Sequence, residues 1–553
     1  MTMASILIGA YLLVLFVLAV YGFHRSHLVY LYYRYRRNVP KPSSRFLQKP
    51  VVTVQLPLFN EMYVVERLLD AVARIRWPRD RLEIQVLDDS TDETVEIAKR
   101  RVAVLAARGL DIKYVHRDDR KGFKAGALEN GLRSARGELV AVFDADFLPG
   151  PGILEDTIDY FADAQVGVVQ ARWEHLNRRY SVLTETQALM LDGHFVVEHG
   201  ARFRSGRFFN FNGTAGIWRR TAIEHAGGWH HETLTEDMDL SYRAQLLGWK
   251  FVYLPRVAVP AELPVDMNAF KSQQFRWAKG SIQVAKKLLP SILRSASSLT
   301  VKIEAVFHLT NNLVYPFIVF LCLLLLPNLV VRTHHGIREV LLIDLPLFFG
   351  TTLSIVSFYV VSQREIGNGT WSALRRLPCL MAVGIGLCIS QSRAVIEALA
   401  GHRSDFVRTP KHGVLGRFEE WTEKKYRVAK NLVPYLELAF ALYHLVAVVV
   451  AIHHGHYFTL PFLVLFAVGF AYVGILSLLG ERLSSCAAKT GRATSGSDER
   501  FPAATVAATT TVAVPGETVA ALACRSPILA GPGPTSLASS VCYSTPSGAQ
   551  GVR

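Results

Sequence analysis

The chain has 553 residues, which is enough for more than one domain with a sizeable buried core. Half of its residues are hydrophobic and its mean hydropathy is positive at +0.22, so membrane spans are expected. The net charge of +15 could suggest nucleic acid, but much of the Lys and Arg flanks apolar runs. No nucleic-acid-binding motif is present, so we expect no nucleic-acid partner.

An almost uninterrupted apolar stretch, Ile6 to Tyr21, opens the chain. Basic residues follow it instead of preceding it, which indicates a retained anchor and not a cleaved signal peptide. The positive-inside rule puts these basic residues in the cytoplasm. We therefore predict a transmembrane anchor over 1–22 with its N-terminus outside, followed by a basic juxtamembrane segment over 23–50.

Alternating strand and helix patterns fill residues 51–264. Short apolar runs predict strands at 51–56, 83–87, 112–115 and 139–143, and helical spacing predicts helices over 61–73 and from a cap at Ser90 or Thr91 towards Arg108. This alternation predicts an α/β domain with a doubly wound, Rossmann-like, mainly parallel sheet. Ligands of such sheets bind beyond the carboxyl ends of the strands.

Two acidic pairs, Asp88-Asp89 and Asp144-Ala-Asp146, follow predicted strands. Asp144 and Asp146 are either ordinary turn or helix-cap residues, or ligands of one divalent cation that bridges a nucleotide diphosphate. Their place at a strand end, with a second acidic pair at a neighbouring one, favours the metal site.

Two further segments allow a structural and a functional interpretation. Lys124 lies in a glycine-containing loop before a helix, and it is either a solvated basic residue or a phosphate ligand. Thr235-Glu236-Asp237 precedes an amphipathic helix. Thr235 with the two acids could simply cap that helix, or Asp237 could be the base that deprotonates an acceptor hydroxyl.

A helix is predicted over 267–289, with Gln273, Arg276, Trp277 and Gly280 on one face. Taken alone, this face suits a membrane-surface helix with an interfacial Trp and a snorkelling Arg. The upstream acids favour another interpretation, in which Arg276 contacts a departing diphosphate and Trp277 stacks on a sugar.

Apolar segments dominate the rest of the chain, with an amphipathic interfacial helix over 265–303 and a membrane region over 304–480. The predicted spans are 305–331, 340–361, 432–452 and 457–479, whereas polar residues within 374–399 favour an interfacial helix there. No predicted span carries a charge pattern that would mark an ion path, which argues against a transporter with a nucleotide-binding domain. The composition of 481–553 predicts a disordered tail. The loop at 404–413 is, by its residues alone, only a basic loop.

Together these residues resemble the processive membrane members of glycosyltransferase family 2, the cellulose synthase superfamily, and within it the plant cellulose-synthase-like A and C proteins. The segments that carry the resemblance are Gln55-Leu-Pro-Leu-Phe-Asn-Glu61, Gln85-Val-Leu-Asp-Asp-Ser-Thr-Asp92, Lys124-Ala-Gly-Ala-Leu128, Phe143-Asp-Ala-Asp-Phe147, Val169-Gln-Ala-Arg-Trp173, Phe211-Asn-Gly-Thr-Ala-Gly-Ile-Trp218 and Gly248-Trp-Lys-Phe251. Phe275 departs from the pattern, since the plant proteins usually carry His there.

The resemblance implies a GT-A catalytic domain that uses a nucleotide sugar, UDP-glucose or GDP-mannose, and Mg²⁺ or Mn²⁺. It implies the following roles: donor binding by Glu61, Asp88, Asp89, Lys124, Asp144, Gln273 and Arg276; metal binding by Asp144 and Asp146; acceptor binding by Phe211, Asn212, Gly213, Thr214 and Trp277; general base catalysis by Asp237 beside Glu236; and a gating loop with Phe406, Thr409 and Lys411.

The implied reaction is an inverting transfer of glucose or mannose to a growing β-linked polysaccharide, with β-1,4-glucan or mannan favoured. The alternative is a non-processive enzyme that adds one sugar to a membrane lipid, as ceramide glucosyltransferase does. We expect a multi-pass protein of the plasma (inner) membrane with a cytoplasmic catalytic domain. The hexose, the linkage position and any protein partners are not decided by these residues.

Overall fold

The computed structural model describes residues 3–331 and 345–494, except residues 403, 405, 417, 418, 420, 422, 423 and 427–430. Most of the predicted tail lies outside these residues, as does the start of the predicted span at 340–361.

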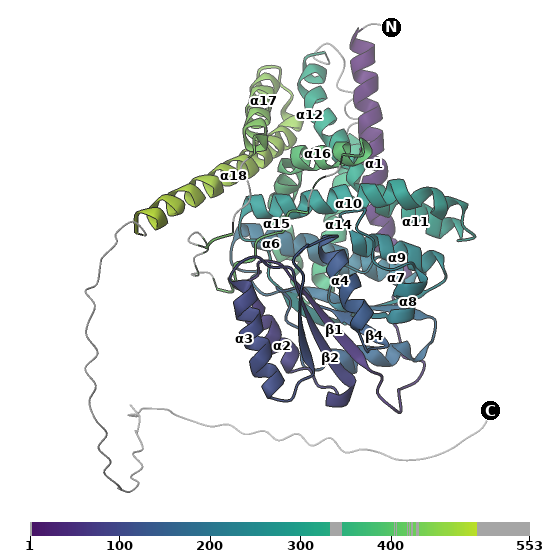
Figure 1. Ribbon diagram of the computed structural model, residues 1–553. Coiled ribbons are helices and arrows are strands. Elements are labelled where there is room, and N and C mark those ends of the chain that lie inside the picture. Colours follow the sequence, from purple (N-terminus) through teal and green to yellow (C-terminus); the bar gives the residue numbers. More distant parts are fainter. Residues whose placement is uncertain are drawn as a thin grey trace, which may run out of the picture. The chain divides into compact units, whose positions relative to one another are not determined.

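A seven-stranded mixed sheet, in the order β3-β2-β1-β4-β6-β5-β7, organises the first half of the chain (Figure 1). Its strands are β1 (Val52–Leu58), β2 (Leu82–Asp88), β3 (Ile112–His116), β4 (Leu139–Val142), β5 (Val166–His175), β6 (Gly216–Arg219) and β7 (Lys250–Ala261). The four strands predicted from the sequence, β1 to β4, are present and parallel. β6 runs antiparallel between β4 and β5, so the sheet is mixed.

Helices cover both faces of the sheet, as the doubly wound prediction requires. α2 (Val65–Ala73), α3 (Thr94–Ala107) and α5 (Ile153–Thr157) pack on one face, and α4 (Phe123–Ser134), α8 (Arg220–His225) and α9 (Glu236–Leu246) pack on the other. Each face of the sheet has its own hydrophobic core, and alternate residues of β4 pack into the two cores. Leu139 and Ala141 pack into the first, and Val140 and Val142 pack into the second. This is the side-chain period of two that a strand imposes.

The start of α3 differs from the sequence prediction. The helix begins at Thr94, whose backbone N–H donates to Asp92 Oδ1 at 2.9 Å, and neither Ser90 nor Thr91 caps it. Ser90 is occupied elsewhere, because its hydroxyl accepts the backbone N–H of Asn60 at 2.7 Å. The prediction of the cap was therefore wrong by a few residues.

The long helix α10 (Met267–Arg294) confirms the helix predicted over 267–289. The side chain of Asp266 caps it by accepting the backbone N–H of Ala269 at 2.9 Å. In Figure 1 α10 crosses between the sheet and the apolar helices. It contacts α9 on the sheet side and α11 (Leu299–Thr310), α16 (Cys388–Leu399) and α18 (Leu460–Thr494) on the other.

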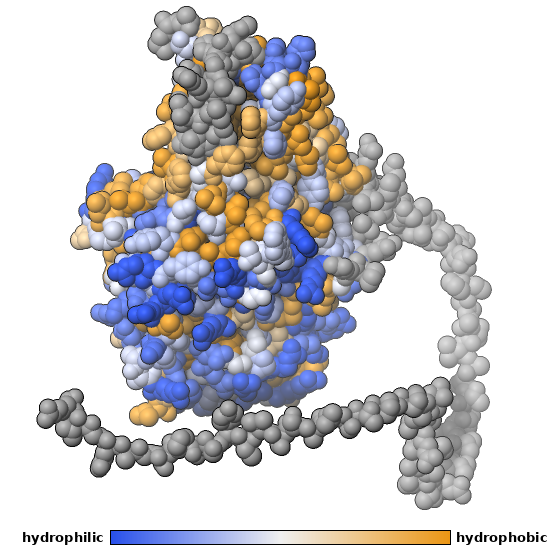
Figure 2. All heavy atoms as spheres, turned by 180° about the vertical axis from the view of Figure 1, so that it is seen from behind, coloured by the Kyte–Doolittle hydropathy of each residue, from blue (hydrophilic) through white to orange (hydrophobic). Residues whose placement is uncertain are grey.

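Four helical stretches of the described chain are long and apolar enough to cross a membrane: Met3–Arg34, Leu299–Val331, Val433–His453 and Tyr457–Glu481. They coincide with the spans predicted at 1–22, 305–331, 432–452 and 457–479, and they contain α1 (Met3–Arg34), α12 (Val314–Val331), α17 (Val433–His453) and most of α18 (Leu460–Thr494). Apolar side chains gather over this part of the molecule, and hydrophilic ones over the sheet domain (Figure 2).

Between these stretches the helices are more broken than predicted. α14 (Leu345–Glu365) covers the described part of the span predicted at 340–361. In place of one interfacial helix over 374–399 there are two, α15 (Thr370–Gly386) and α16 (Cys388–Leu399), bent by 44°. Together the two could form a fifth, broken span. α18 also continues to Thr494, into the predicted tail, because extending an existing helix costs far less than nucleating one.

A buried ion pair joins α10 to the apolar helices. Lys271 Nζ lies 2.6 Å from Glu437 Oε1 of α17 and donates to Ser477 Oγ of α18 at 3.3 Å. Glu437 thus places a charged residue inside a predicted span, but a single ion pair is not the charge pattern that would mark an ion path. Its carboxylate is tolerated because a cation from a helix distant in the sequence neutralises it.

Removing one partner should leave the other charged and buried, at a cost of about 3–5 kcal/mol. We expect Lys271→Met and Glu437→Leu each to lower the apparent melting temperature of the detergent-purified protein, as followed by intrinsic fluorescence. The double variant Lys271→Met/Glu437→Leu should recover most of the loss. A double variant as unstable as the sum of the two singles would contradict a direct pairing.

Candidate active site

One cavity lies at the carboxyl ends of β1 and β4 and is closed on the other side by α10 and the 406–411 segment. The sequence-predicted residues that line it are Glu61, Asp89, Lys124, Asp144, Asp146, Asn212, Gly213, Glu236, Asp237, Gln273, Arg276, Trp277, Phe406, Thr409 and Lys411. Residues from eight separate segments thus meet at the sheet edge where the topology predicts a ligand.

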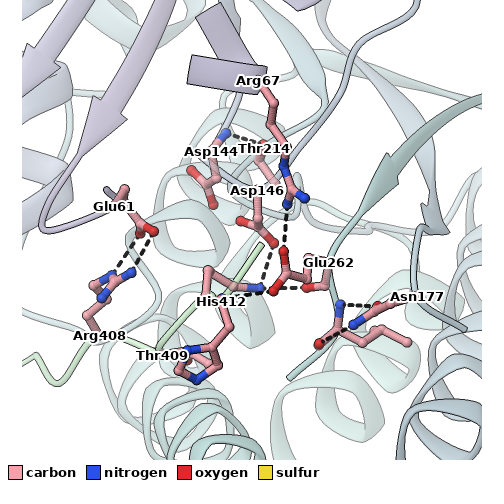
Figure 3. Close-up of polar contacts among 12 residues, drawn as sticks. Glu61, Arg67, Asp144, Asp146, Asn177, Thr214, Glu262, Arg408, Thr409 and His412 are labelled. Carbon is pink, nitrogen blue, oxygen red and sulfur yellow. Dashed lines mark hydrogen bonds and ion pairs between the residues drawn. The ribbon is translucent and has the colours of Figure 1, made fainter. Parts of the chain in front are cut away.

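Three predicted site residues stay outside this lining. Asp88 is buried beneath it, where it accepts hydrogen bonds from the Tyr114 hydroxyl at 2.7 Å and from Ser90 N–H at 2.9 Å. The Phe211 ring packs edge-on against Trp218 in the second core. Thr214 lies behind Asp144 and accepts its backbone N–H at 2.9 Å (Figure 3). These three residues lie behind the cavity wall. The geometry therefore does not favour the direct contacts with donor or acceptor that were predicted for them.

Each acid of the Asp144-Ala-Asp146 turn faces a lysine. Asp144 Oδ1 lies 2.5 Å from Lys124 Nζ, and Lys411 Nζ donates to Asp146 Oδ2 at 2.6 Å. Burial raises the pKa of Asp144, although the charge of Lys124 opposes that shift. Burial also disfavours the ammonium form of Lys124, but Asp144 and Glu236 outweigh it and raise the pKa of this lysine.

These two acids meet the requirements of a Mg²⁺ or Mn²⁺ site formed with a substrate. Within the described residues, no group of three or more His, Cys, Asp or Glu side chains forms a ready-made metal site. Mg²⁺, however, is commonly held by one or two carboxylates, with substrate phosphates and water completing its shell. Asp144 and Asp146 supply such a pair of hard oxygen ligands on one cavity wall.

Asp237 lies in the first turn of α9, with its carboxyl group at the cavity. Burial raises its pKa to about 7, and the neighbouring Glu236 adds to the rise while Lys124 opposes it. Thr235 precedes the helix without making a side-chain cap bond, whereas Asp237 Oδ1 accepts the backbone N–H of Met238 at 2.8 Å, so this acid contacts the start of the helix as well as lining the cavity. Gly213 has φ +78°, and an added Cβ there would lie 3.1 Å from Asp237 Oδ2. Glycine is needed both for that backbone and for that close approach.

α10 contributes a cation and an indole to the same cavity. Arg276 donates to Thr409 Oγ1 at 2.6 Å, and its guanidinium lies 4.5 Å from the centre of the Phe406 ring. Burial lowers the pKa of Arg276 to about 10, so it remains charged at neutral pH. The Trp277 ring lies 6.4 Å from that of Trp173. Phe275 points elsewhere, towards Arg393 of α16 at 5.7 Å, and does not line the cavity.

The predicted gating segment reaches into the cavity through ion pairs. Besides Lys411, it contributes Arg408, whose Nε and Nη2 donate to the two oxygens of Glu61 at 2.8 and 2.6 Å (Figure 3). Burial raises the pKa of Glu61, and the bidentate contact with Arg408 opposes this rise.

Sequence reasoning missed several cavity residues. Arg408 was among them, although its neighbours were predicted. Glu262 directly follows β7 and accepts hydrogen bonds from Arg67 at 2.6 Å and from the His412 N–H at 2.9 Å. It carried the same signal as Asp144, an acid at a strand end. Arg120, whose guanidinium lies 3.3 Å from the centre of the Phe59 ring, had no such signal.

Comparison with known proteins agrees with this geometry. Residues 50–280 match the family model "Glycosyltransferase like family 2" and residues 217–466 match "Cellulose synthase". Probable glucomannan 4-beta-mannosyltransferase 11 of Arabidopsis thaliana is 38% identical over 324 residues, which is 56% of this chain and 73% of that protein. Probable glucomannan 4-beta-mannosyltransferase 10 of the same plant is 41% identical over 286 residues, 50% of this chain and 52% of that protein.

Glucomannan 4-beta-mannosyltransferase 1 of Oryza sativa subsp. japonica is 45% identical over 251 residues, 44% of this chain and 48% of that protein. The chain thus spans about half the length of most of these curated relatives. A mannosyltransferase from Pyrobaculum calidifontis, solved with GDP-Man and Mn2+, has a TM-score of 0.48 at 21% identity, over 71% of this chain and 100% of that one.

The mixed sheet and the family match define a glycosyltransferase with a Rossmann-like GT-A catalytic domain. The chain belongs to glycosyltransferase family 2, within the cellulose synthase superfamily. The resemblance drawn from the sequence motifs is thereby confirmed.

The Glu61–Arg408 contact should hold the 404–413 segment over the cavity. We expect Arg408→Gln to speed amide hydrogen exchange across residues 406–412 about tenfold, as measured by mass spectrometry, because a bidentate charged contact is replaced by a weaker neutral one. Lys425→Gln, which removes an exposed pair with Glu93, is the matched control and should leave that exchange unchanged. Equal exchange in both variants would contradict the anchoring role.

Proposed function

We propose that this glycosyltransferase moves mannose or glucose from a nucleoside-diphosphate sugar to a growing β-1,4-linked polysaccharide, with inversion at the anomeric carbon. One observation carries the proposal: a carboxyl group with a near-neutral pKa, two cations and an indole share one cavity. The names of the relatives, glucomannan 4-beta-mannosyltransferases, support the choice of polymer.

The donor would lie along the acidic and basic wall of the cavity. Glu61 and Asp89, which line this wall, would contact the nucleoside, and Lys124 and Arg276 would contact the diphosphate. Their positive charges would stabilise the diphosphate as it departs, and buried cations do this more strongly than solvated ones. Asp144 and Asp146 would hold Mg²⁺ or Mn²⁺, which supplies further positive charge to that leaving group when bound.

Asp237 would accept the proton of the acceptor hydroxyl as that oxygen attacks the anomeric carbon. The new carbon–oxygen bond forms on the face opposite the breaking bond to phosphate, so the configuration inverts. A base with a pKa of about 7 suits this task, because a substantial fraction is ionised at neutral pH and the carboxylate still binds a proton well. Trp277 would stack on the acceptor sugar beside it.

A second cavity extends this site towards the apolar helices. It shares Trp173, Asn212, Asp237, Gln273 and Trp277 with the first cavity. Its other lining residues include Arg25, His308, Asn311, Tyr315 and Phe358. We place the acceptor chain here, with its growing end at Asp237, and infer that the polymer leaves along the apolar helices. In this arrangement the protein lies in the plasma membrane with its catalytic domain in the cytoplasm and its N-terminus outside, as the basic flank of the first span favours.

The proposal predicts polymer formation by the purified, membrane-reconstituted protein. Labelled GDP-mannose and UDP-glucose are offered separately with β-1,4-linked mannan and glucan oligosaccharides, and products are analysed for length and linkage. We expect one donor to give a ladder of β-1,4-linked products. A single glycolipid would support the lipid-transferring alternative, and no transfer from either donor would overturn the proposal.

The assignment of Asp237 as the general base predicts how the activity depends on pH. We expect kcat/KM to fall as the pH drops through about 7, because protonated Asp237 cannot accept the hydroxyl proton. Asp237→Asn should lower kcat at least about a hundredfold at every pH. Glu224→Gln removes an exposed carboxylate of α8 that pairs with Arg220, and it is the control. Activity that survives Asp237→Asn would refute the assignment of the base.

A further inference from the structure

A histidine of a π-helical turn faces the second cavity next to the proposed acceptor site. The turn, η3 (Gly193–His199), follows α6 (Val182–Asp192), and both His194 and Glu198 line the cavity. His194 Nδ1 lies 2.9 Å from Glu198 Oε2, and its Nε2 lies 3.1 Å from Asn212 Nδ2. Single π turns of this kind frequently occur at functional sites.

The charge of Glu198 determines which way these hydrogen bonds run. Burial alone would raise the pKa of Glu198, but Arg202 and His194 outweigh it and hold that pKa well below its ordinary value. Glu198 is therefore an acceptor, and His194 Nδ1 must donate to it. The tautomer with its proton on Nδ1 leaves Nε2 as an acceptor, and in that tautomer the Asn212 side-chain N–H₂ donates to Nε2.

This chain of bonds orients the Asn212 carboxamide. With its nitrogen held by His194, its Oδ1 is buried and has no hydrogen-bond partner among the described residues. A buried acceptor without a partner is costly, which suggests that a ligand supplies the missing donor. Asn212 lines both cavities, and the Gly213 next to it approaches the Asp237 carboxyl. A sugar hydroxyl at this point would lie beside the proposed base.

Residues outside the sheet domain also help to hold the His194 side chain in this orientation. Arg202 Nη1 lies 3.3 Å from Glu198 Oε2, and its Nε donates to Glu304 Oε1 of α11 at 2.9 Å. The other oxygen of Glu304 lies 3.0 Å from His24 Nε2 of α1. The imidazole of His194 is thus held by a chain of polar contacts that starts on the apolar helices.

We propose that His194 is a positioning residue for the acceptor: it holds the Asn212 carboxamide so that Oδ1 accepts a hydrogen bond from a hydroxyl of the acceptor sugar beside Asp237. The inference rests on the proposed function, and it adds Asn212 Oδ1 as the contacting atom and the Glu198–His194 pair as its support.

The test compares variants of His194 that keep or remove the hydrogen bond. His194→Gln can still accept from Asn212 through Oε1 and donate to Glu198 through Nε2, whereas His194→Phe keeps the ring volume and does neither. We expect His194→Phe to raise the KM for a β-1,4-linked hexose hexasaccharide about tenfold, the effect of one lost hydrogen bond of average strength, and His194→Gln to stay near the wild-type KM. His116→Gln, on the outer strand β3 and away from both cavities, is the control.

Two further measurements separate positioning from a general structural effect. Hydrolysis of the nucleotide sugar by water needs no acceptor, so its rate and the donor KM should be unchanged in His194→Phe. Asn212→Ala should raise the acceptor KM as much as His194→Phe does, and the double variant should be no worse than Asn212→Ala alone. If His194→Phe fails to fold, as judged by donor hydrolysis, His194→Ala takes its place in this cycle.

A wild-type acceptor KM in a His194→Phe or His194→Ala protein that still hydrolyses the donor would overturn the inference. Additive effects of the His194→Phe and Asn212→Ala substitutions would overturn it too. Failure of the proposed function looks different, because the wild-type protein would then hydrolyse and transfer no nucleotide sugar at all.

Discussion

The structure depends on one constraint, the need to neutralise charges that are buried at the edge of the sheet. Moving an unpaired ion out of water costs several kcal/mol even after relaxation, so each buried acid requires a cation close by. Asp144 faces Lys124 from a neighbouring helix, and Asp146 faces Lys411 from a segment 265 residues further along. Glu61 is paired in the same way by Arg408. The pairs hold the 406–411 segment against the catalytic domain. The same burial raises the pKa of Asp237, which suits it to act as a base.

The helix α10 connects the charged cavity to the apolar part of the chain. Its first turn is tied to α17 and α18 by Lys271, and its middle turns present Gln273, Arg276 and Trp277 to the cavity. Gly280 then lets it approach Thr235 so closely that an added Cβ would lie 2.5 Å from the Thr235 methyl group. One helix therefore fixes the distance between the proposed base, the proposed phosphate ligands and the helices that could cross a membrane.

Much of this could be predicted because it is local. The four parallel strands and the flanking helices follow from side-chain periodicity, and Asp144, Asp146 and Asp89 were predicted to be site residues because they follow strands. The same argument failed for Asp88, whose alternation along β2 turns it under the sheet edge and towards Tyr114. The family resemblance implied acceptor contacts for Phe211 and Thr214, and their side chains lie behind the cavity wall, because a motif identifies a segment and does not decide which of its side chains face the cavity. Arg408 and His194 had no local signal, since their partners are far away in the sequence.

The sequence by itself determined the fold class, the family, the stretches able to cross a membrane and the segments that supply the site, because periodicity, strand-end position and motif order are properties of neighbouring residues. Only the tertiary structure decided which charge pairs with which, that two cavities share Asp237 and Trp277, and that Glu198 orients His194 and through it Asn212. Those features depend on distances across the packed core, and burial, which sets the pKa values, exists only after packing.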